Sequence, residues 1–206
     1  MTGTTAHTPL VDLRFHNDLT IDPAHAPNDI SMLDFTIFLH EAYALPQELV
    51  VSLRAHPELQ LRLLLVARNG TRRFTNVPQI VRTTKAMGFE VVLDDTDFEN
   101  MAGFAEVVNW CNVIMGVHGA GLTNLVFLPM NVVAIQIASC YDLEEVAEHT
   151  YEPSTRDSGM LYLQYGISVD ESTLLESYLR DHPMFIDPQS IHHQGWFKMG
   201  KIYLKQ

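Results

Sequence analysis

The pattern of apolar positions divides the chain into an irregular first part and a regular second part. Residues 1–58 carry scattered prolines and histidines, and one stretch, 31–46, spaces its apolar residues as a helix does, with Ser31 as a cap and Pro46 as a stop. In the second part, short apolar runs alternate with longer amphipathic runs. We therefore expect a lead-in with a helical, interdomain segment at 1–58, and one folded domain with a C-terminal extension at 59–206.

The regular part predicts alternating strands and helices. Apolar runs of strand length lie at 61–67, 89–95, 113–117 and 132–137. Helical spacing lies between them, at 76–88, 97–112 and 121–129. Phe104 and Trp110, both in the second of these helices, are expected in the core. This alternation is typical of βαβ crossovers, so we expect an α/β fold with a Rossmann-like, mostly parallel sheet that binds ligands beyond the carboxyl ends of its strands.

Composition narrows the possible ligands without changing the fold prediction. The 206 residues are 47% hydrophobic and 18% charged, which suits a globular domain with a sizeable core. The formal net charge is −12 and 13 residues are Lys or Arg, so no nucleic-acid partner is expected, because phosphate backbones require a basic surface. An anionic ligand would have to be bound by a local cluster of donors.

One such cluster follows the first predicted strand. The loop ARNGTRRFTN places Arg68, Arg72 and Arg73 within six positions, just ahead of a predicted helix. Guanidinium groups donate paired hydrogen bonds to phosphate or carboxylate, so the loop indicates an anion site. The same pattern also fits a solvated turn whose arginines pair with neighbouring acids, and the sequence leaves both interpretations open.

A second cluster, GVHGAGLTN, follows the third predicted strand. Its glycines allow close approach of a ligand to the backbone, and the amides that open the next helix suit a diphosphate. Its spacing is neither the dinucleotide-binding fingerprint nor a Walker loop, and a tight turn with glycines chosen for packing explains it equally well. His118, between two glycines at a strand end, is the residue that favours ligand binding.

No metal or cofactor is expected from the sequence. Cys111 and Cys140 lack metal-ligand spacing, and Cys111 has the apolar neighbours of a reduced core cysteine. The acidic run 94–97 is better explained as a solvated helix cap than as a cation site. His192 and His193 lack a third convergent ligand. The first long strand is not followed by a dinucleotide fingerprint, which disfavours a nicotinamide oxidoreductase.

Taken together and in order, several blocks of the sequence resemble glycosyltransferase family 61, most closely its plant members. These blocks are FHNDLTIDP, LLLVARNGTRRFTN, FAEVVNWCNVI, GVHGAGLTNLVFLP, ISVDESTLL, RDHP and IHHQGW. The resemblance runs from about Phe15 to the last residues. It implies an inverting enzyme of the GT-B type, in which the second of two Rossmann-like domains binds the nucleotide-sugar donor. Plant members transfer xylose or arabinose to xylan or N-glycans, and animal relatives transfer N-acetylglucosamine.

The resemblance also implies roles for the two clusters. Arg68 and Arg73 would face the donor diphosphate, with Arg72 in the same loop. The pocket for the nucleotide sugar would be lined by His118, Gly119, Ala120, Gly121, Thr123 and Asn124. These donors would stabilise a diphosphate leaving group without a metal.

Family members run to several hundred residues, so we expect this chain to be the donor-binding half of such an enzyme, with the N-terminal domain largely missing. The expected reaction is inverting transfer of a pentose from a UDP-sugar to a polysaccharide or N-glycan, with no catalytic base assigned. The alternative is a truncated, non-catalytic nucleotide-sugar-binding or partner domain. Golgi location and membrane attachment through an N-terminal anchor follow from the family, since the sequence contains neither a signal peptide nor a membrane span.

Overall fold

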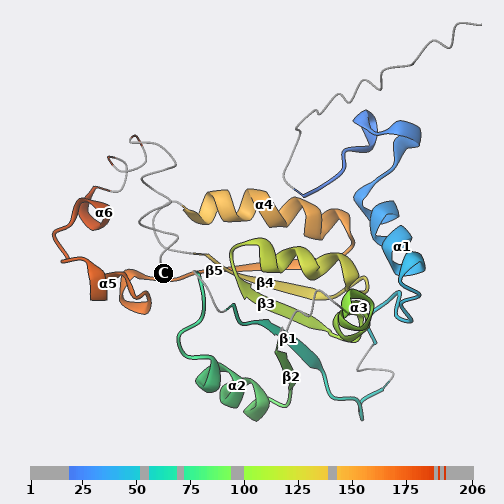
Figure 1. The fold of residues 1–206 in the computed structure, drawn as a ribbon, viewed down its shortest axis with the longest axis horizontal. Helices are drawn as coiled ribbons and strands as arrows, with labels where there is room; N and C mark the ends of the chain where they lie inside the picture. The colour runs from blue at the N-terminus through green and yellow to red at the C-terminus, as the bar shows by residue number, and fades with distance from the viewer. Residues whose placement is uncertain are drawn as a thin grey trace, which may run out of the picture.

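Five parallel strands form a single sheet at the centre of the molecule (Figure 1). The computed structural model describes residues 19–51, 56–68, 72–93, 100–138 and 143–187, together with Ser190 and His193. The strands are β1 (Arg62–Val66), β2 (Glu90–Leu93), β3 (Val113–Val117), β4 (Val133–Ala138) and β5 (Leu161–Gly166). The first four confirm the predicted strands where these are described, whereas β5 was not predicted.

Four helices confirm predicted ones: α1 (Met32–Ala42) in the lead-in, and α2 (Val77–Ala86), α3 (Met101–Asn109) and the 3-10 helix η4 (Ala120–Phe127) between the strands. The helix between β4 and β5, α4 (Leu143–Asp157), was not predicted. Shorter helical turns are η1 (Pro23–His25), η2 (Pro27–Asp29), η5 (Val169–Glu171), α5 (Leu174–Ser177) and α6 (Pro183–Ile186). Ser31 caps α1 as predicted, in a reciprocal capping box with Asp34. The side chain of Asn100 caps α3, while the acidic run 94–97 lies outside the described residues.

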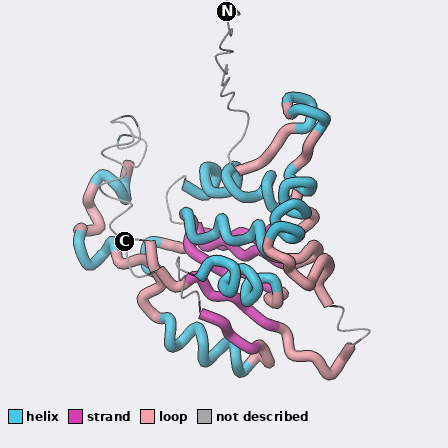
Figure 2. The backbone as a smooth tube through the Cα atoms, turned by 45° about the vertical axis from the view of Figure 1, so that its right-hand side comes forward, coloured by secondary structure: helices cyan, strands magenta, loops and turns pink. Residues whose placement is uncertain are grey.

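Helices cover the sheet on both faces, which makes the fold doubly wound (Figure 2). On one face, α2 packs over Leu63, Leu65 and Val113. On the other, α3, η4 and α4 pack over a larger cluster that includes Leu64 and Ile114. Helix α1 of the lead-in contacts both η4 and α4, so the lead-in shares this second core.

The strand order is β2-β1-β3-β4-β5, one of the two common orders of doubly wound sheets. From β1 the chain moves outward to β2, and from β3 it moves in the opposite direction to β4. The loops that leave β1 and β3 therefore diverge, and this opens a crevice at their carboxyl ends. Val66 of β1 pairs with Gly116 of β3, so the arginine loop and the glycine turn begin at the same edge of the sheet.

The three expectations about core residues have different outcomes. Phe104 lies in the main core cluster as predicted, but the prediction for Trp110 is wrong, because 42% of its surface is exposed. Trp110 is the C-cap of α3, so it lies beyond the last residue of the helix, whose buried positions include Phe104 and Val108. Cys111 is fully buried, and burial raises the pKa of its thiol to about 11, as expected for an inert core cysteine.

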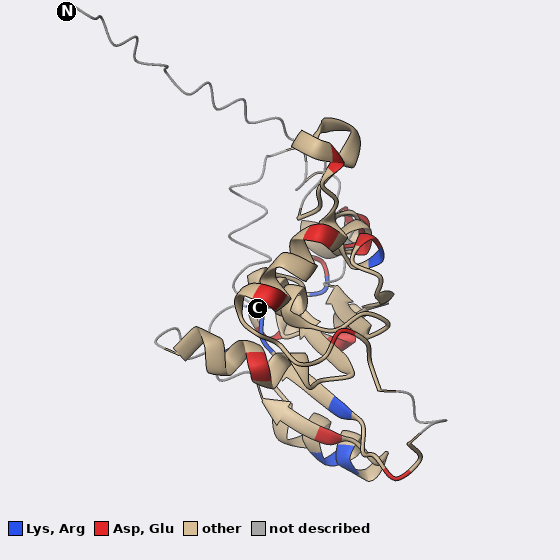
Figure 3. Cartoon of the chain, turned by 90° about the vertical axis from the view of Figure 1, so that its right-hand side faces the viewer, with Lys and Arg blue, Asp and Glu red and all other residues tan. Residues whose placement is uncertain are grey.

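Acidic residues are spread over the described elements, including Glu41 of α1, Glu90 of β2 and Glu152 of α4 (Figure 3). Three of the described arginines pair with a carboxylate: Arg62 with Glu90, Arg156 with Glu152, and Arg180 with Asp170. Within the described part of the chain, no helix is long and apolar enough to cross a membrane.

Candidate functional site

The structure brings the arginine loop and the glycine turn into direct contact. A Cβ placed on Gly119 would lie 2.5 Å from Nη1 of Arg68 and 3.2 Å from Cζ of Arg72. Gly119 also has a φ of 145°, a region that other residues rarely adopt. Two guanidinium groups thus lie against a backbone position that only glycine can fill without displacing them.

The other two glycines of the turn serve packing. A Cβ on Gly121 would lie 2.6 Å from Cγ1 of Val66, and one on Gly116 would lie 3.0 Å both from Cβ of Val66 and from Cδ2 of Leu122. These glycines let η4 pack closely against β1 and β3. Gly116 and Gly121 therefore fit the packing interpretation, whereas Gly119 differs from them in contacting the two arginines.

The two arginines have buried donors that bond none of the described residues. Nη1 of Arg68 and Nε of Arg72 are buried, and neither finds a hydrogen-bond partner in the described ranges. The pKa of Arg72 is lowered, first by burial and then by the charge of Arg68, with a smaller opposing influence from Tyr151. Arg72 also has a positive φ of 52°, which is uncommon outside glycine, asparagine and aspartate. An anion placed between these guanidinium groups would relieve their repulsion and satisfy their buried donors.

Tyr151 of α4 contacts the glycine turn at Gly119 and at His118. Its hydroxyl donates a hydrogen bond of 2.7 Å to the carbonyl oxygen of Gly119, and its ring meets that of His118 edge to face, with centroids 5.8 Å apart. The His118 amide donates to the Ile137 carbonyl oxygen at 2.9 Å, which anchors the turn to β4. Sequence reasoning missed Tyr151, because it lies 32 residues beyond Gly119 in a helix that was not predicted.

The remaining predicted residues lie on η4. Ala120 is the exposed first residue of this helix, and Gly121 follows it. The Thr123 hydroxyl donates to the Ala120 carbonyl oxygen at 2.6 Å, so it is already engaged within the helix. Asn124 is half-buried on the same helix.

A pocket of about 350 Å³, which we call the strand-end crevice, adjoins the arginines. Arg72 and the exposed Arg73 line one side of it. Its apolar walls come mainly from Val117, Ile137, Tyr165 and Ile167, at or just beyond the carboxyl ends of β3, β4 and β5.

Glu171 lies at the border of the strand-end crevice. Its carboxylate accepts hydrogen bonds of 2.8 Å from the Ser168 amide, the Ser168 hydroxyl and the Tyr165 hydroxyl. The Ser168 amide is the largest cause that lowers the pKa of Glu171, so this residue adds an anionic group to the crevice that Arg72 and Arg73 also line. The crevice therefore combines apolar walls, hydroxyls and a carboxylate with a cationic end.

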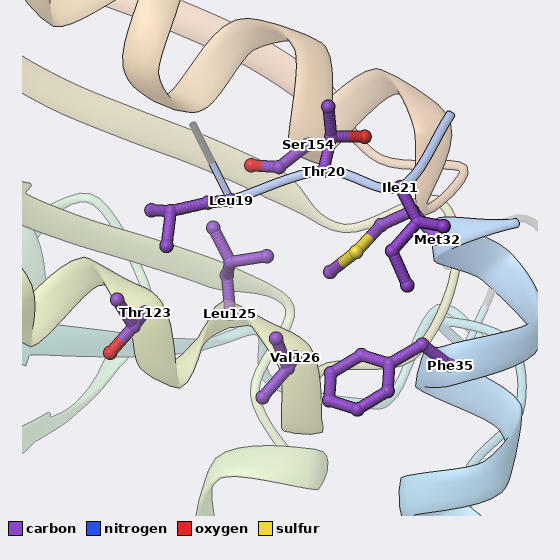
Figure 4. Close-up of a pocket in the computed structure, with 9 residues that line it drawn as sticks. All are labelled: Leu19, Thr20, Ile21, Met32, Phe35, Thr123, Leu125, Val126 and Ser154. Atoms are coloured by element: carbon purple, nitrogen blue, oxygen red, sulfur yellow. The ribbon is translucent and has the colours of Figure 1, made fainter. Parts of the chain in front are cut away.

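A second pocket, of about 300 Å³, lies between residues 19–21, α1 and η4 (Figure 4). We call it the apolar pocket. Leu19 and Ile21 line it from the lead-in, Met32 and Phe35 from α1, and Leu125 from η4. Its polar lining side chains are the hydroxyl residues Thr20, Thr123 and Ser154.

The described residues contain no group of three His, Cys, Asp or Glu side chains that could hold a metal ion. The acidic run 94–97, Cys140 and His192 lie outside these residues. The site described above instead offers hydrogen-bond donors and positive charge, which suit an anionic ligand such as a phosphate group.

Comparison with known proteins shows what the chain resembles. A family profile described as Glycosyltransferase 61 matches residues 19–135. The chain is 45% identical over 197 residues to the beta-1,2-xylosyltransferase XYXT1 of Oryza sativa subsp. japonica, covering 95% of this chain and 42% of the relative. It is 40% identical over 188 residues to the alpha-1,3-arabinosyltransferase XAT3 of the same organism, covering 91% of this chain and 33% of the relative. A more distant relative is the xylan glycosyltransferase MUCI21 of Arabidopsis thaliana, 32% identical over 208 residues, covering 95% of this chain and 42% of the relative. The chain thus spans less than half the length of these relatives.

Proposed function

Because the chain belongs to the glycosyltransferase 61 family, we propose that it binds a UDP-sugar and contributes to the transfer of a pentose, xylose or arabinose, to a polysaccharide or N-glycan. The relatives named above as xylosyl-, arabinosyl- and xylan glycosyltransferases support the sugar and the acceptor class. The observation that carries the proposal is the pair of buried guanidinium donors of Arg68 and Arg72 beside Gly119, which find no partner among the residues that the structure describes.

The donor is proposed to lie along the carboxyl edge of the sheet. Its diphosphate lies against Arg68 and Arg72, where two positive charges meet two negative phosphates. Its nucleoside lies in the strand-end crevice, whose apolar walls suit a base and whose carboxylate and hydroxyls suit ribose hydroxyls. Arg73, exposed at the rim, adds positive charge without close contact to Gly119.

The proposed chemistry breaks the bond between the anomeric carbon and the diphosphate oxygen. Negative charge grows on the departing diphosphate, and the two guanidinium groups stabilise it where a metal ion would otherwise do so. An acceptor hydroxyl attacks from the opposite side of the ring, which inverts the anomeric carbon, and a base takes its proton. We assign the donor steps to this chain and assign the base to none of its described residues.

In the inverting GT-B scheme that the family implies, the acceptor is bound across a cleft by a second domain. Because the chain spans only part of its relatives, a non-catalytic donor-binding or partner role is the second candidate function. By the same resemblance, we propose that the protein acts in the Golgi lumen, attached to the membrane through an N-terminal anchor.

Calorimetric titration tests donor binding directly. We expect UDP, UDP-xylose and UDP-arabinose to bind the folded chain, and NADH not to bind. Absence of UDP binding by correctly folded protein would refute the proposed function.

An assay of sugar transfer to xylan oligomers separates the two candidate functions. It compares this chain with a chimera in which the rice xylosyltransferase supplies the portion that this chain does not match. Transfer by the chimera alone would identify this chain as the donor-binding part of the enzyme. Transfer by neither, despite UDP binding by both, would favour the non-catalytic role.

A further inference from the structure

Tyr151 fixes the orientation of one peptide group at the centre of the proposed site. The side chain is buried, with 3% of its surface exposed, and its hydroxyl donates to the Gly119 carbonyl oxygen at 2.7 Å. The same carbonyl oxygen accepts a second hydrogen bond, of 3.0 Å, from the Leu122 amide. Two donors from different elements thus define the direction of this carbonyl group.

The direction of the carbonyl determines that of the next amide. The described chain contains no cis peptide bond, and in a planar trans peptide the N–H points opposite to the C=O. Because the Gly119 carbonyl points toward α4 and the interior of η4, the Ala120 N–H points away from them. Ala120 is exposed and is the first residue of η4, where amides are available to bind anions.

Tyr151 is itself well anchored. Its backbone carbonyl accepts hydrogen bonds from the hydroxyls of Ser154, at 3.1 Å, and Thr155, both of which are buried in α4. Its ring packs edge to face against His118, on the strand side of Gly119. The phenol also lies close enough to Arg72 to influence the pKa of its guanidinium group.

From these contacts we infer that Tyr151 is a positioning residue of the donor site, which turns the Gly119–Ala120 peptide so that the Ala120 amide joins Arg68 and Arg72 in binding the donor diphosphate. The inference rests on the proposed function, since it names how that site is held. In this role Tyr151 acts through the Gly119 carbonyl group and contacts no substrate.

The test compares Tyr151→Phe with the wild-type protein. The substitution keeps the ring and its packing but removes the hydrogen bond to Gly119. We expect UDP and inorganic pyrophosphate to bind roughly three- to tenfold more weakly, because one hydrogen bond that orients the site is lost. Uridine, which has no phosphate, should bind equally well to both proteins.

Tyr162→Phe is the matched control. Tyr162 lies on β5, where its hydroxyl bonds Gln164 and Gln136 and does not reach the glycine turn, so this variant should bind all three ligands as the wild type does. In amide NMR spectra, pyrophosphate should shift the Ala120 resonance in the wild type, and this shift should be reduced in Tyr151→Phe.

The possible results separate the two proposals. Wild-type protein that binds neither UDP nor pyrophosphate would overturn the proposed function and this inference together. Wild-type protein that binds both, with Tyr151→Phe equal to it, would overturn the role of Tyr151 alone. Equal weakening for uridine would also overturn that role, since it would show that Tyr151 supports the whole pocket and not the phosphate contact.

Discussion

The strand-end crevice and the apolar pocket have similar volumes, about 350 Å³ and 300 Å³, but very different chemistry. The crevice is lined by Arg72 and Arg73, and the buried donors of Arg72 and its neighbour Arg68 bond no described residue. The apolar pocket offers only hydroxyl groups beside its aliphatic and aromatic walls. The comparison teaches that volume alone does not distinguish the two pockets, and we propose the crevice as the ligand site because a bound anion would offset the free-energy cost of burying unsatisfied charged donors.

Replacement of both arginines is expected to lower UDP affinity more than any other change, and far more than a change in the apolar pocket. Arg68→Ala combined with Arg72→Ala removes the charged donors beside Gly119, and each is worth about 1.5–3 kcal/mol when it bonds a charged ligand. We expect UDP affinity, measured by calorimetry, to fall at least about a hundredfold. Phe35→Ala, which enlarges the apolar pocket, should leave UDP affinity within about twofold of the wild type. A comparable loss in Phe35→Ala would contradict the assignment of the donor to the crevice.

The next largest effect is expected at Gly119. In Gly119→Ala, the new Cβ would clash with Nη1 of Arg68 and crowd Cζ of Arg72, so at least one guanidinium group must move. We expect UDP binding to weaken roughly ten- to hundredfold, the value of one charged hydrogen bond. Gly88→Ala is the control, because Gly88 also has positive φ but no atom within 4 Å of the added Cβ. Gly88→Ala should lower the free energy of unfolding by about 1 kcal/mol and leave UDP affinity unchanged. Equal affinity losses at the two glycines would indicate that backbone strain, and not displacement of the arginines, is responsible.

The sequence predicted the part of this site that depends on local pattern. Apolar runs and their breaks identified β1 and β3, and the order of elements placed both polar loops at carboxyl ends of parallel strands. The sequence could not show that Gly119 contacts Arg68 while Gly121 contacts Val66, because these contacts depend on how closely η4 approaches β1. The pattern of glycines alone is compatible with either role.

The elements that sequence reasoning missed have specific physical causes. Pro153 lies inside α4, where it removes a backbone donor and would ordinarily predict a helix break. Strand β5 is an edge strand whose Leu161 and Leu163 are exposed, so it lacks the buried apolar run of the central strands. Tyr151 could not be found without α4, since only the packing of that helix brings its hydroxyl to the turn.

A smaller effect, on stability alone, is expected at Gly121. In Gly121→Ala, the added Cβ would overlap Cγ1 of Val66, and overpacking of this kind should lower the free energy of unfolding by about 1–2 kcal/mol. Adding Val66→Ala removes the overlapping methyl groups. The loss of stability in the double variant, measured by urea unfolding, should therefore be smaller than the sum of the two single losses. Additive losses would argue against a packing role for Gly121.

The smallest effect is expected at Asp34, which stabilises α1 as one wall of the apolar pocket. Its exposed carboxylate accepts hydrogen bonds from the Ser31 hydroxyl, the main cause that lowers its pKa, and from the Ser31 amide. Because the folded pKa lies below the unfolded value, this contribution to stability is complete above the unfolded pKa and is lost as the pH falls through the folded pKa. Asp34→Asn should therefore melt slightly below the wild type near neutral pH, with a difference that shrinks below about pH 4. Thermal melts at several pH values measure this difference in melting temperature, and UDP titration of the same variant measures its effect on binding.

A difference in melting temperature that does not depend on pH would exclude the carboxylate as its cause. Weaker UDP binding by Asp34→Asn would show that the two pockets are coupled through η4.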